Sequence, residues 1–200
     1  LSSSKGNSNV LKVDKIWYSF PVGESNTVFV GPKIENYYMH GTTPSIYKPV
    51  LKAFTLGGNA AAYGASTDTG AGWAYKADNG FAISSNIGTK SKTTQEDANE
   101  NYLESGLLTN ESKTSWATQV GLTKEQYAVS AMVNLKYNGW SDSYFTAGPA
   151  QTGNTTNYGL RAWWRPLETG TATPEVSVGY DYTTIADVAD TVDSTDAYFV

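Results

Sequence analysis

The stretch from Tyr127 to Tyr137 has a strict period of two, and this constrains the fold more than any other feature of the chain. One parity is wholly apolar: Tyr127, Val129, Ala131, Val133, Leu135 and Tyr137. The other parity is mostly small or polar: Ala128, Ser130, Met132, Asn134 and Lys136. Since successive side chains of a β-strand point to opposite faces, the stretch predicts a strand with one apolar and one polar face.

The same alternation recurs along the chain and predicts an all-β fold of about eight strands and the start of a ninth. We expect strands at 12–20, 27–36, 70–77, 81–89, 116–122, 127–137, 157–165, 175–182 and 197–200. Pro32 predicts a bulge or a missing ladder bond in the second strand. Short turns alternate with long polar loops, which indicates an antiparallel up-and-down order. A short helix is expected at 45–54, with Pro49 in its first turn.

Composition excludes several classes of protein. The chain has no cysteine and a single histidine, His40, so neither a disulfide scaffold nor a multi-histidine metal site is possible. A net charge of −5 argues against a nucleic-acid partner. Phosphate-loop, dinucleotide-binding and serine-nucleophile motifs are absent, so we expect no enzyme activity, cofactor or metal. The acidic repeat of Asp187, Asp190, Asp193 and Asp196 is interpreted as a solvated loop.

Two architectures fit the alternation. In a soluble β-sandwich the apolar face packs on a second sheet, and such a domain would bind or cleave glycans. In a transmembrane β-barrel the apolar face contacts lipid and the polar face lines a water-filled lumen. Aromatic residues at strand ends, strands of about 8–11 residues and alternating loop lengths favour the barrel.

Specific runs of the sequence resemble a known family. They include Gly31-Pro32-Lys33, the hairpin around 116–129, Arg161-Ala162-Trp163-Trp164-Arg165-Pro166 and Thr173-Pro174-Glu175-Val176-Ser177-Val178-Gly179-Tyr180. These runs resemble cyanobacterial outer-membrane porins, which belong with the carbohydrate-selective (OprB-like) porins and are also described as iron-uptake porins. The resemblance implies a homotrimeric pore in the cell outer membrane for small hydrophilic solutes and ions, including sugars or iron. Family members are longer, so residues 1–200 are expected to be an internal piece of a single barrel domain.

The polar parity supplies candidate pore-lining residues. Its cations are Lys15, Lys33, Lys76, Lys136, Arg161 and Arg165, and its acids are Glu35, Glu175 and Asp181. The basic excess predicts a preference for anions, although the same residues could simply be solvated. Trp163 shares the parity of both arginines and could stack on a sugar ring or pack against another lumenal element.

The long connection 37–68 is the candidate constriction loop, folded into the pore. In this interpretation the side chains that face the passage are His40, Tyr47, Lys48 and Lys52. The alternative is that the connection forms an external cap or a trimer contact. Long loops with some structure of their own are often functional.

Overall fold

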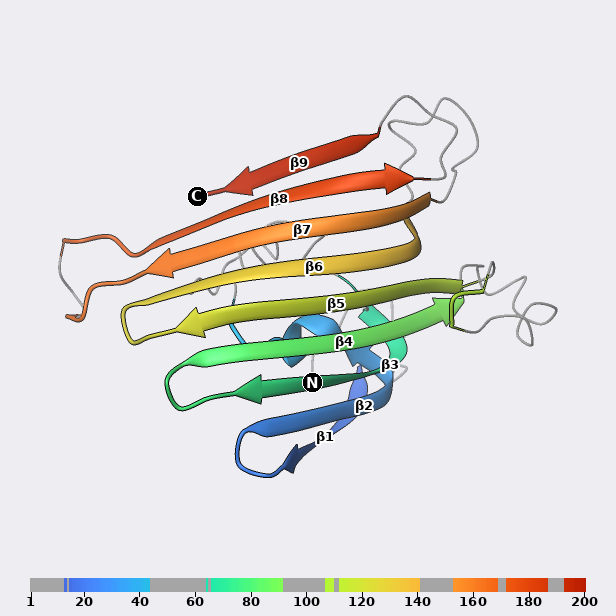
Figure 1. Ribbon diagram of the computed structural model, residues 1–200, viewed down its shortest axis with the longest axis horizontal. Coiled ribbons are helices and arrows are strands. Elements are labelled where there is room, and N and C mark those ends of the chain that lie inside the picture. The colour runs from blue at the N-terminus through green and yellow to red at the C-terminus, as the bar shows by residue number, and fades with distance from the viewer. Residues whose placement is uncertain are drawn as a thin grey trace, which may run out of the picture.

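The computed structural model describes residues 13, 15–43, 64, 66–91, 107–109, 112–140, 153–168, 172–186 and 193–200. In this part of the chain nine strands form one antiparallel sheet in sequential order, which confirms the all-β, up-and-down prediction (Figure 1). The strands are β1 (Ile16–Val22), β2 (Asn26–Glu35), β3 (Ser66–Lys76), β4 (Phe81–Ser91), β5 (Ser112–Thr123), β6 (Tyr127–Trp140), β7 (Gly153–Trp164), β8 (Val176–Ala186) and β9 (Ser194–Phe199).

The ladder runs from β1 to β9, and no pairing between these two outermost strands closes the described sheet. One turn of 3-10 helix, η1 (Asn36–Met39), follows β2. Within the described ranges no helix is both long and apolar enough to cross a membrane. The helix expected at 45–54 lies outside the described residues.

Short and long connections alternate as expected from β1 to β7, and the alternation stops there. The connections after β1, β3 and β5 are turns of three or four residues at one end of the sheet, on the left in Figure 1, and the connection of eleven residues after β7 lies at the same end. The connections after β2, β4 and β6 have twelve residues or more and start from the opposite end, as does the seven-residue connection after β8. We call these the short-turn end and the long-loop end. Asp78-Asn79-Gly80 makes one of the short turns, where the Gly80 amide donates to the Ala77 carbonyl over 2.9 Å.

Strands extend further at the long-loop end than the hydrophobic pattern predicted. Strand β5 begins at Ser112 rather than Trp116, β7 begins at Gly153, β8 continues to Ala186 and β9 begins at Ser194. The added residues are mostly Ser, Thr, Lys and Asn, which carry no apolar alternation but still pair through their backbones. Side-chain pairs reinforce the extension, as between the hydroxyls of Thr89 and Thr114 at 3.1 Å.

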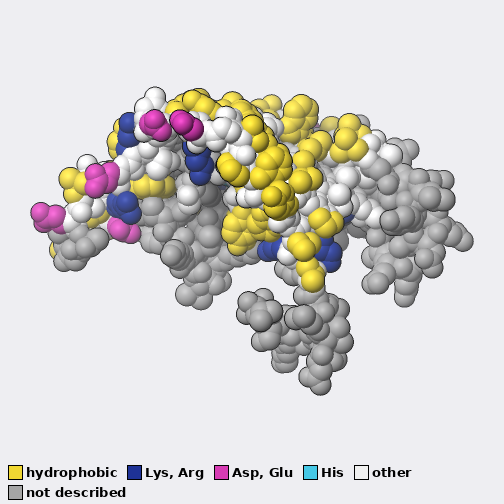
Figure 2. Space-filling view, turned by 90° about the horizontal axis from the view of Figure 1, so that it is seen from below, with side chains coloured by type: hydrophobic (Ala, Val, Ile, Leu, Met, Phe, Trp, Pro, Cys, Tyr) yellow, Lys and Arg dark blue, Asp and Glu magenta, His cyan; other side chains and the backbone are white. Residues whose placement is uncertain are grey.

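The two faces of the sheet are inverted relative to a water-soluble protein. Apolar side chains are exposed on the face that we call the outer face: Leu160 is 60% exposed and Trp116 is 52% exposed. Polar side chains are buried on the opposite, inner face, where Asn134 is 0% and Gln119 is 2% exposed. Figure 2 shows hydrophobic side chains gathered over the arched surface of the molecule. Buried polar and exposed large apolar groups are the informative exceptions to ordinary burial.

The sequence predicted a bulge or a missing ladder bond at Pro32, and the structure has a bulge there. The bulge moves one predicted pore-lining residue, Lys33, off the inner face. The register of β2 shifts between Gly31 and Ile34, so Ile34 takes the buried position that an unbroken strand would give to Lys33. Lys33 instead pairs with Ile16, and its ammonium donates to the Val13 carbonyl oxygen over 2.9 Å. Lys33 is exposed and does not join the inner row, because an extra residue in a strand reverses the parity that follows it.

Gly23 and Gly80 provide a matched test of two turns. Both have left-handed φ angles, +67° and +87°, but a Cβ on Gly80 would lie 2.1 Å from the Thr123 carbonyl oxygen, whereas one on Gly23 meets nothing within 4 Å. We expect Gly23→Ala to lower the free energy of unfolding by about 1–2 kcal/mol. Gly80→Ala should lower it by roughly 2–5 kcal/mol, because the steric conflict adds to the backbone strain. Denaturant titration measures both, and equal losses would contradict this account of the turn.

Candidate functional site

The inner face divides into two regions of different side-chain size. On β3, β4 and β5 its residues are mostly small: Gly70, Gly72, Ala74, Ala82, Ser84, Gly88, Ala117 and Gly121. On β6, β7 and β8 its residues are mostly polar or charged: Ser130, Asn134, Lys136, Thr155, Asn157, Arg161, Asp181 and Thr183. The small region leaves room for chain to lie on the sheet, and the polar region presents hydrogen-bonding groups.

A segment of the connection after β2 occupies the small region. Residues 36–43, which we call the in-turned segment, lie on the inner face behind β3 and β4 in Figure 1. The Thr42 amide donates to Oε1 of Gln119 over 2.9 Å, and Nε2 of Gln119 donates to the Thr42 carbonyl over 3.0 Å. The Gly41 amide donates to Oγ of Ser84 over 3.1 Å. The side chain of Gln119 therefore pairs with the segment as a neighbouring strand's backbone would.

Close approach of the segment depends on the small residues below it. A Cβ on Gly121 would lie 2.4 Å from Oγ1 of Thr42, so a larger residue there would displace the segment. The described beginning of the 37–68 connection, residues 37–43, thus lies on the inner face of the sheet. Constriction of a passage by this loop stays a prediction. Tyr47, Lys48 and Lys52 lie outside the described residues.

His40 and Tyr37 flank η1. His40 is buried at the C-terminal end of η1 rather than exposed to solvent. Burial raises the pKa of the Tyr37 phenol, and the adjacent Tyr38 and Glu35 raise it further, so Tyr37 is uncharged at neutral pH. The rings of Tyr37 and Tyr38 lie 4.3 Å apart between centroids. Of the four residues predicted to face the passage from this loop, His40 lies in the described part of the chain, and it is buried.

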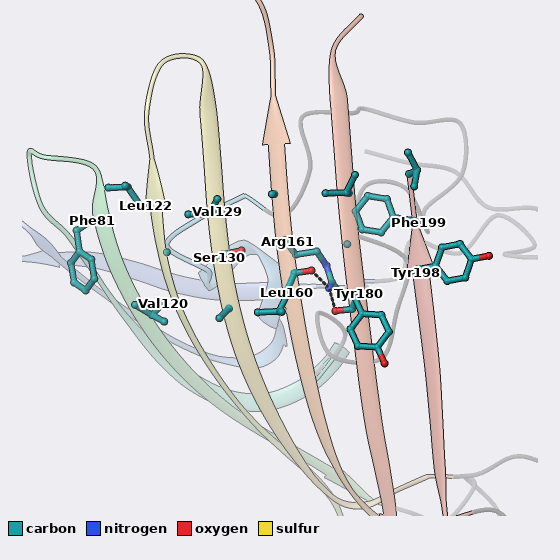
Figure 3. Close-up of a pocket in the computed structure, with 16 residues that line it drawn as sticks. Phe81, Val120, Leu122, Val129, Ser130, Leu160, Arg161, Tyr180, Tyr198 and Phe199 are labelled. Atoms are coloured by element: carbon teal, nitrogen blue, oxygen red, sulfur yellow. Dashed lines mark hydrogen bonds between the residues drawn. The ribbon is translucent and has the colours of Figure 1, made fainter.

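Four of the predicted pore-lining residues form two ion pairs on the inner face. The Arg161 guanidinium contacts the Asp181 carboxylate at 2.5 Å, and both side chains are buried. Nη1 of Arg161 also donates to the carbonyls of Leu160 and Tyr180, over 2.9 and 3.1 Å (Figure 3). At the opposite edge, the Lys15 ammonium lies 2.6 Å from the buried Glu35 carboxylate. Buried charges need such partners because desolvation costs several kcal/mol per ion.

Other predicted residues lie near the short-turn end. Lys76 is exposed and pairs across the ladder with buried Ala82, which places it on the inner face. The Arg165 guanidinium lies over the ring of buried Trp163, 5.6 Å from its centroid, and its Nε donates to the Glu125 carbonyl. Glu175 is exposed just before β8. These side chains form a polar rim rather than one cluster with Arg161.

Sequence reasoning missed three charged inner-face residues at the long-loop end. Lys90 pairs directly with Lys113 across β4 and β5, and the Lys90 ammonium lies 2.9 Å from the Asp68 carboxylate of β3. All three fall in segments that were expected to be loops or to precede the strands. Continuing the parity of Asn86 and Ala117 by four residues would have placed Lys90 and Lys113 on the inner face.

The described inner face is basic although the chain is acidic. It holds six cations (Lys15, Lys76, Lys90, Lys113, Lys136 and Arg161) and three carboxylates (Glu35, Asp68 and Asp181). The net charge of the chain is −5. Each of these three carboxylates contacts a cation. No group of three or more His, Asp or Glu residues that could hold a metal ion occurs in the described ranges.

A buried hydrogen-bond chain links the polar strands. Ser115 donates to Oδ1 of Asn134 over 2.7 Å, Nδ2 of Asn157 donates to the Asn134 carbonyl over 3.0 Å, and Thr183 donates to Oδ1 of Asn157 over 2.8 Å. Such fully paired polar networks rigidify a buried surface.

Comparison with known proteins adds no relative: no family model, curated protein or solved structure matches the chain.

Removing the amide of Gln119 tests how the in-turned segment is held. Gln119→Leu leaves the Thr42 N–H and C=O without their partner, and unpaired buried groups cost about 1–3 kcal/mol each. We expect hydrogen exchange at the Thr42 amide to accelerate at least tenfold. Ser84→Ala is the matched control, because it removes only the Gly41 bond and should accelerate exchange at Gly41 more than at Thr42. Unchanged exchange in Gln119→Leu would show that the segment is held by other contacts.

Proposed function

We propose that this sheet is part of the wall of a transmembrane β-barrel that lets small hydrophilic solutes and ions diffuse passively across an outer membrane. The outer face contacts lipid and the inner face lines a water-filled passage. The proposal includes the porin family that the sequence resembles, and with it a homotrimer and solutes such as inorganic ions, sugars or iron. Passive diffusion requires neither catalysis nor a cofactor.

The inversion of the two faces carries the proposal. A contiguous apolar surface spans β4 to β9, where Phe81, Val120, Leu160, Val178 and Tyr180 line a shallow hollow (Figure 3). Water penalises such a surface at about 25 cal/mol per Å² of apolar area, whereas hydrocarbon does not. Outward apolar and inward polar residues alternate in the same way along strands of membrane barrels.

The apolar band crosses the sheet obliquely, which also supports a membrane. One row of directly paired outer-face residues is apolar on β2 to β6 and hydroxylated on β7 to β9: Val30, Ala71, Ile87, Trp116, Leu135, Thr156, Thr184 and Ser194. A flat lipid layer meets strands that tilt through it at different heights, and barrel strands tilt by about 35–45°. An oblique band is therefore the pattern expected of a barrel wall.

Strand length and aromatic residues agree with the same environment. Strands β3 to β8 have 11 to 14 residues, and a tilted membrane strand needs about 9–11. Tyr127 and Trp164 pair on the outer face at the short-turn end, and Tyr158 and Tyr182 pair towards the long-loop end. Tyr and Trp are enriched at both membrane–water interfaces.

The soluble β-sandwich alternative has less support. It requires a second sheet over the apolar face, and the described residues form a single sheet whose apolar face is exposed. A glycan-binding or glycan-cleaving domain is therefore the less favoured proposal.

Substitution by lysine at two positions on the outer face, one within the apolar band and one beyond it, tests whether this face contacts lipid. Leu160→Lys places a charge within the apolar band, and lysine near the bilayer midplane costs about 2–4 kcal/mol in barrels. Thr184→Lys is the matched control above the band, where the cost falls to about 0–1 kcal/mol. Folding free energies measured in phospholipid vesicles should show this difference. A soluble protein would tolerate both, because both side chains are already exposed.

Conductance tests the passage and its charge. In planar bilayers under a KCl gradient we expect ion-permeable channels whose reversal potential indicates a preference for anions, since cations predominate on the inner face. Lys136→Glu should move the reversal potential towards cation preference. Lys124→Glu makes the same charge change in an exposed turn between β5 and β6 and should move it less. Cation preference in the unaltered barrel would refute the anion-selective wall, and absence of conductance from the barrel that contains this sheet would refute the channel.

A further inference from the structure

We propose that Lys90, Lys113 and Lys136 form a binding site for a small oxyanion, of which inorganic phosphate is the simplest example. The site lies at the long-loop end of the inner face. It rests on the proposed function in one respect, since it assigns a preferred solute class to the same passage. The site itself is argued from strand register and charge.

Strand register places the three lysines at neighbouring positions on one face of the sheet. Lys90 and Lys113 are direct partners on β4 and β5. Lys136 of β6 pairs with Ser115, so Lys113, two residues earlier on β5, is its diagonal neighbour. Directly paired residues of an antiparallel ladder have Cβ atoms about 4.5–5.5 Å apart, and diagonal neighbours are about 7–8 Å apart. Side chains as long as lysine therefore reach a common point above the sheet.

Charge at this position is incompletely compensated. Asp68 contacts Lys90, and Asp181, which is paired with Arg161, also interacts electrostatically with Lys136. Neither Lys113 nor Lys136 has a salt bridge to any residue in the described part of the chain. The three lysines and Arg161, counted against Asp68 and Asp181, leave a local charge of +2. Like charges directly opposite each other destabilise a ladder, so an anion between them would relieve a real cost.

A neutral donor adjoins the lysines. Thr155 of β7 is the direct partner of Lys136 and is buried. Its Oγ1 accepts a hydrogen bond from Nδ2 of Asn157 over 3.0 Å, so its own hydroxyl hydrogen remains available. Ammonium groups and a hydroxyl are hydrogen-bond donors, and lysine binds phosphate as a compact point charge. A doubly charged oxyanion with several acceptor oxygens matches both the charge and the donors.

Equilibrium binding of ³²P-labelled inorganic phosphate to the full chain in detergent, in chloride buffer, tests the site. We expect phosphate to bind at least tenfold more tightly than chloride. The double variant Lys113→Gln/Lys136→Gln should weaken phosphate binding by about tenfold or more, in line with the loss of close charge pairs. Lys124→Gln removes a distant exposed charge and should change the affinity less than twofold.

Misfolding of the double variant would also abolish binding, so a second variant is chosen that should bind phosphate more tightly. Asp68→Asn removes the negative charge that contacts Lys90, so phosphate should bind several-fold more tightly. Equal affinity for phosphate and chloride, or a double variant that binds like the unaltered protein, would overturn the site. Loss of affinity in Asp68→Asn would also overturn it.

The same variants separate this inference from the channel proposal. Protein that conducts in bilayers but binds phosphate no better than chloride retains the channel and loses the site. Protein that binds phosphate in the predicted lysine-dependent way, but gives no conductance, retains the site and loses the channel.

Discussion

A β-ladder gives each side chain only two directions, and every other feature of this structure depends on which direction faces which solvent. The nine strands pair in sequence, so the faces chosen by β6 extend through the ladder to all its neighbours. A slip of one residue between β6 and β7 would place Asn157 among valines and Tyr158 against the buried amides. Both faces penalise that slip, because one excludes polar groups and the other excludes large apolar groups. Register is therefore specified from both sides of the sheet.

Strand order and faces could be predicted from sequence because hydrophobic alternation reports them directly. Strand ends could not, because alternation reports only the apolar band. Ser112 and Thr184 continue their strands beyond it, with hydroxyl side chains that give no periodic signal. Lys33 was misplaced for a different reason. A bulge at Pro32 was expected, but its effect on later parity depends on where the register recovers, and local sequence does not encode that position.

The inner-face site was predictable in its parts and not in its contacts. Parity alone placed Arg161 and Asp181 on the same face, but their contact also requires the β7–β8 register, which pairs Arg161 with Gly179. The bonds between Thr42 and Gln119 join residues 77 apart and have no local signal. The nearest clue is the contrast between small inner residues on β3 to β5 and larger polar ones on β6 to β8. Such a contrast indicates which part of a face is covered by other chain.

The charged side chains of the inner face need either water or oppositely charged partners around them. Lys113 and Lys136 have no salt bridge within the described chain, and an ammonium group removed from water without a partner costs several kcal/mol. In the proposed barrel, water or anions reach the long-loop end of the inner face and solvate these groups. On the opposite face of the same sheet, the exposed side chains of Leu160, Trp116 and Val129 require apolar surroundings. A barrel wall with hydrocarbon on one side and enclosed water on the other would meet both requirements. Under that proposal, charge preference and hydration of the passage have a common origin in Lys113 and Lys136.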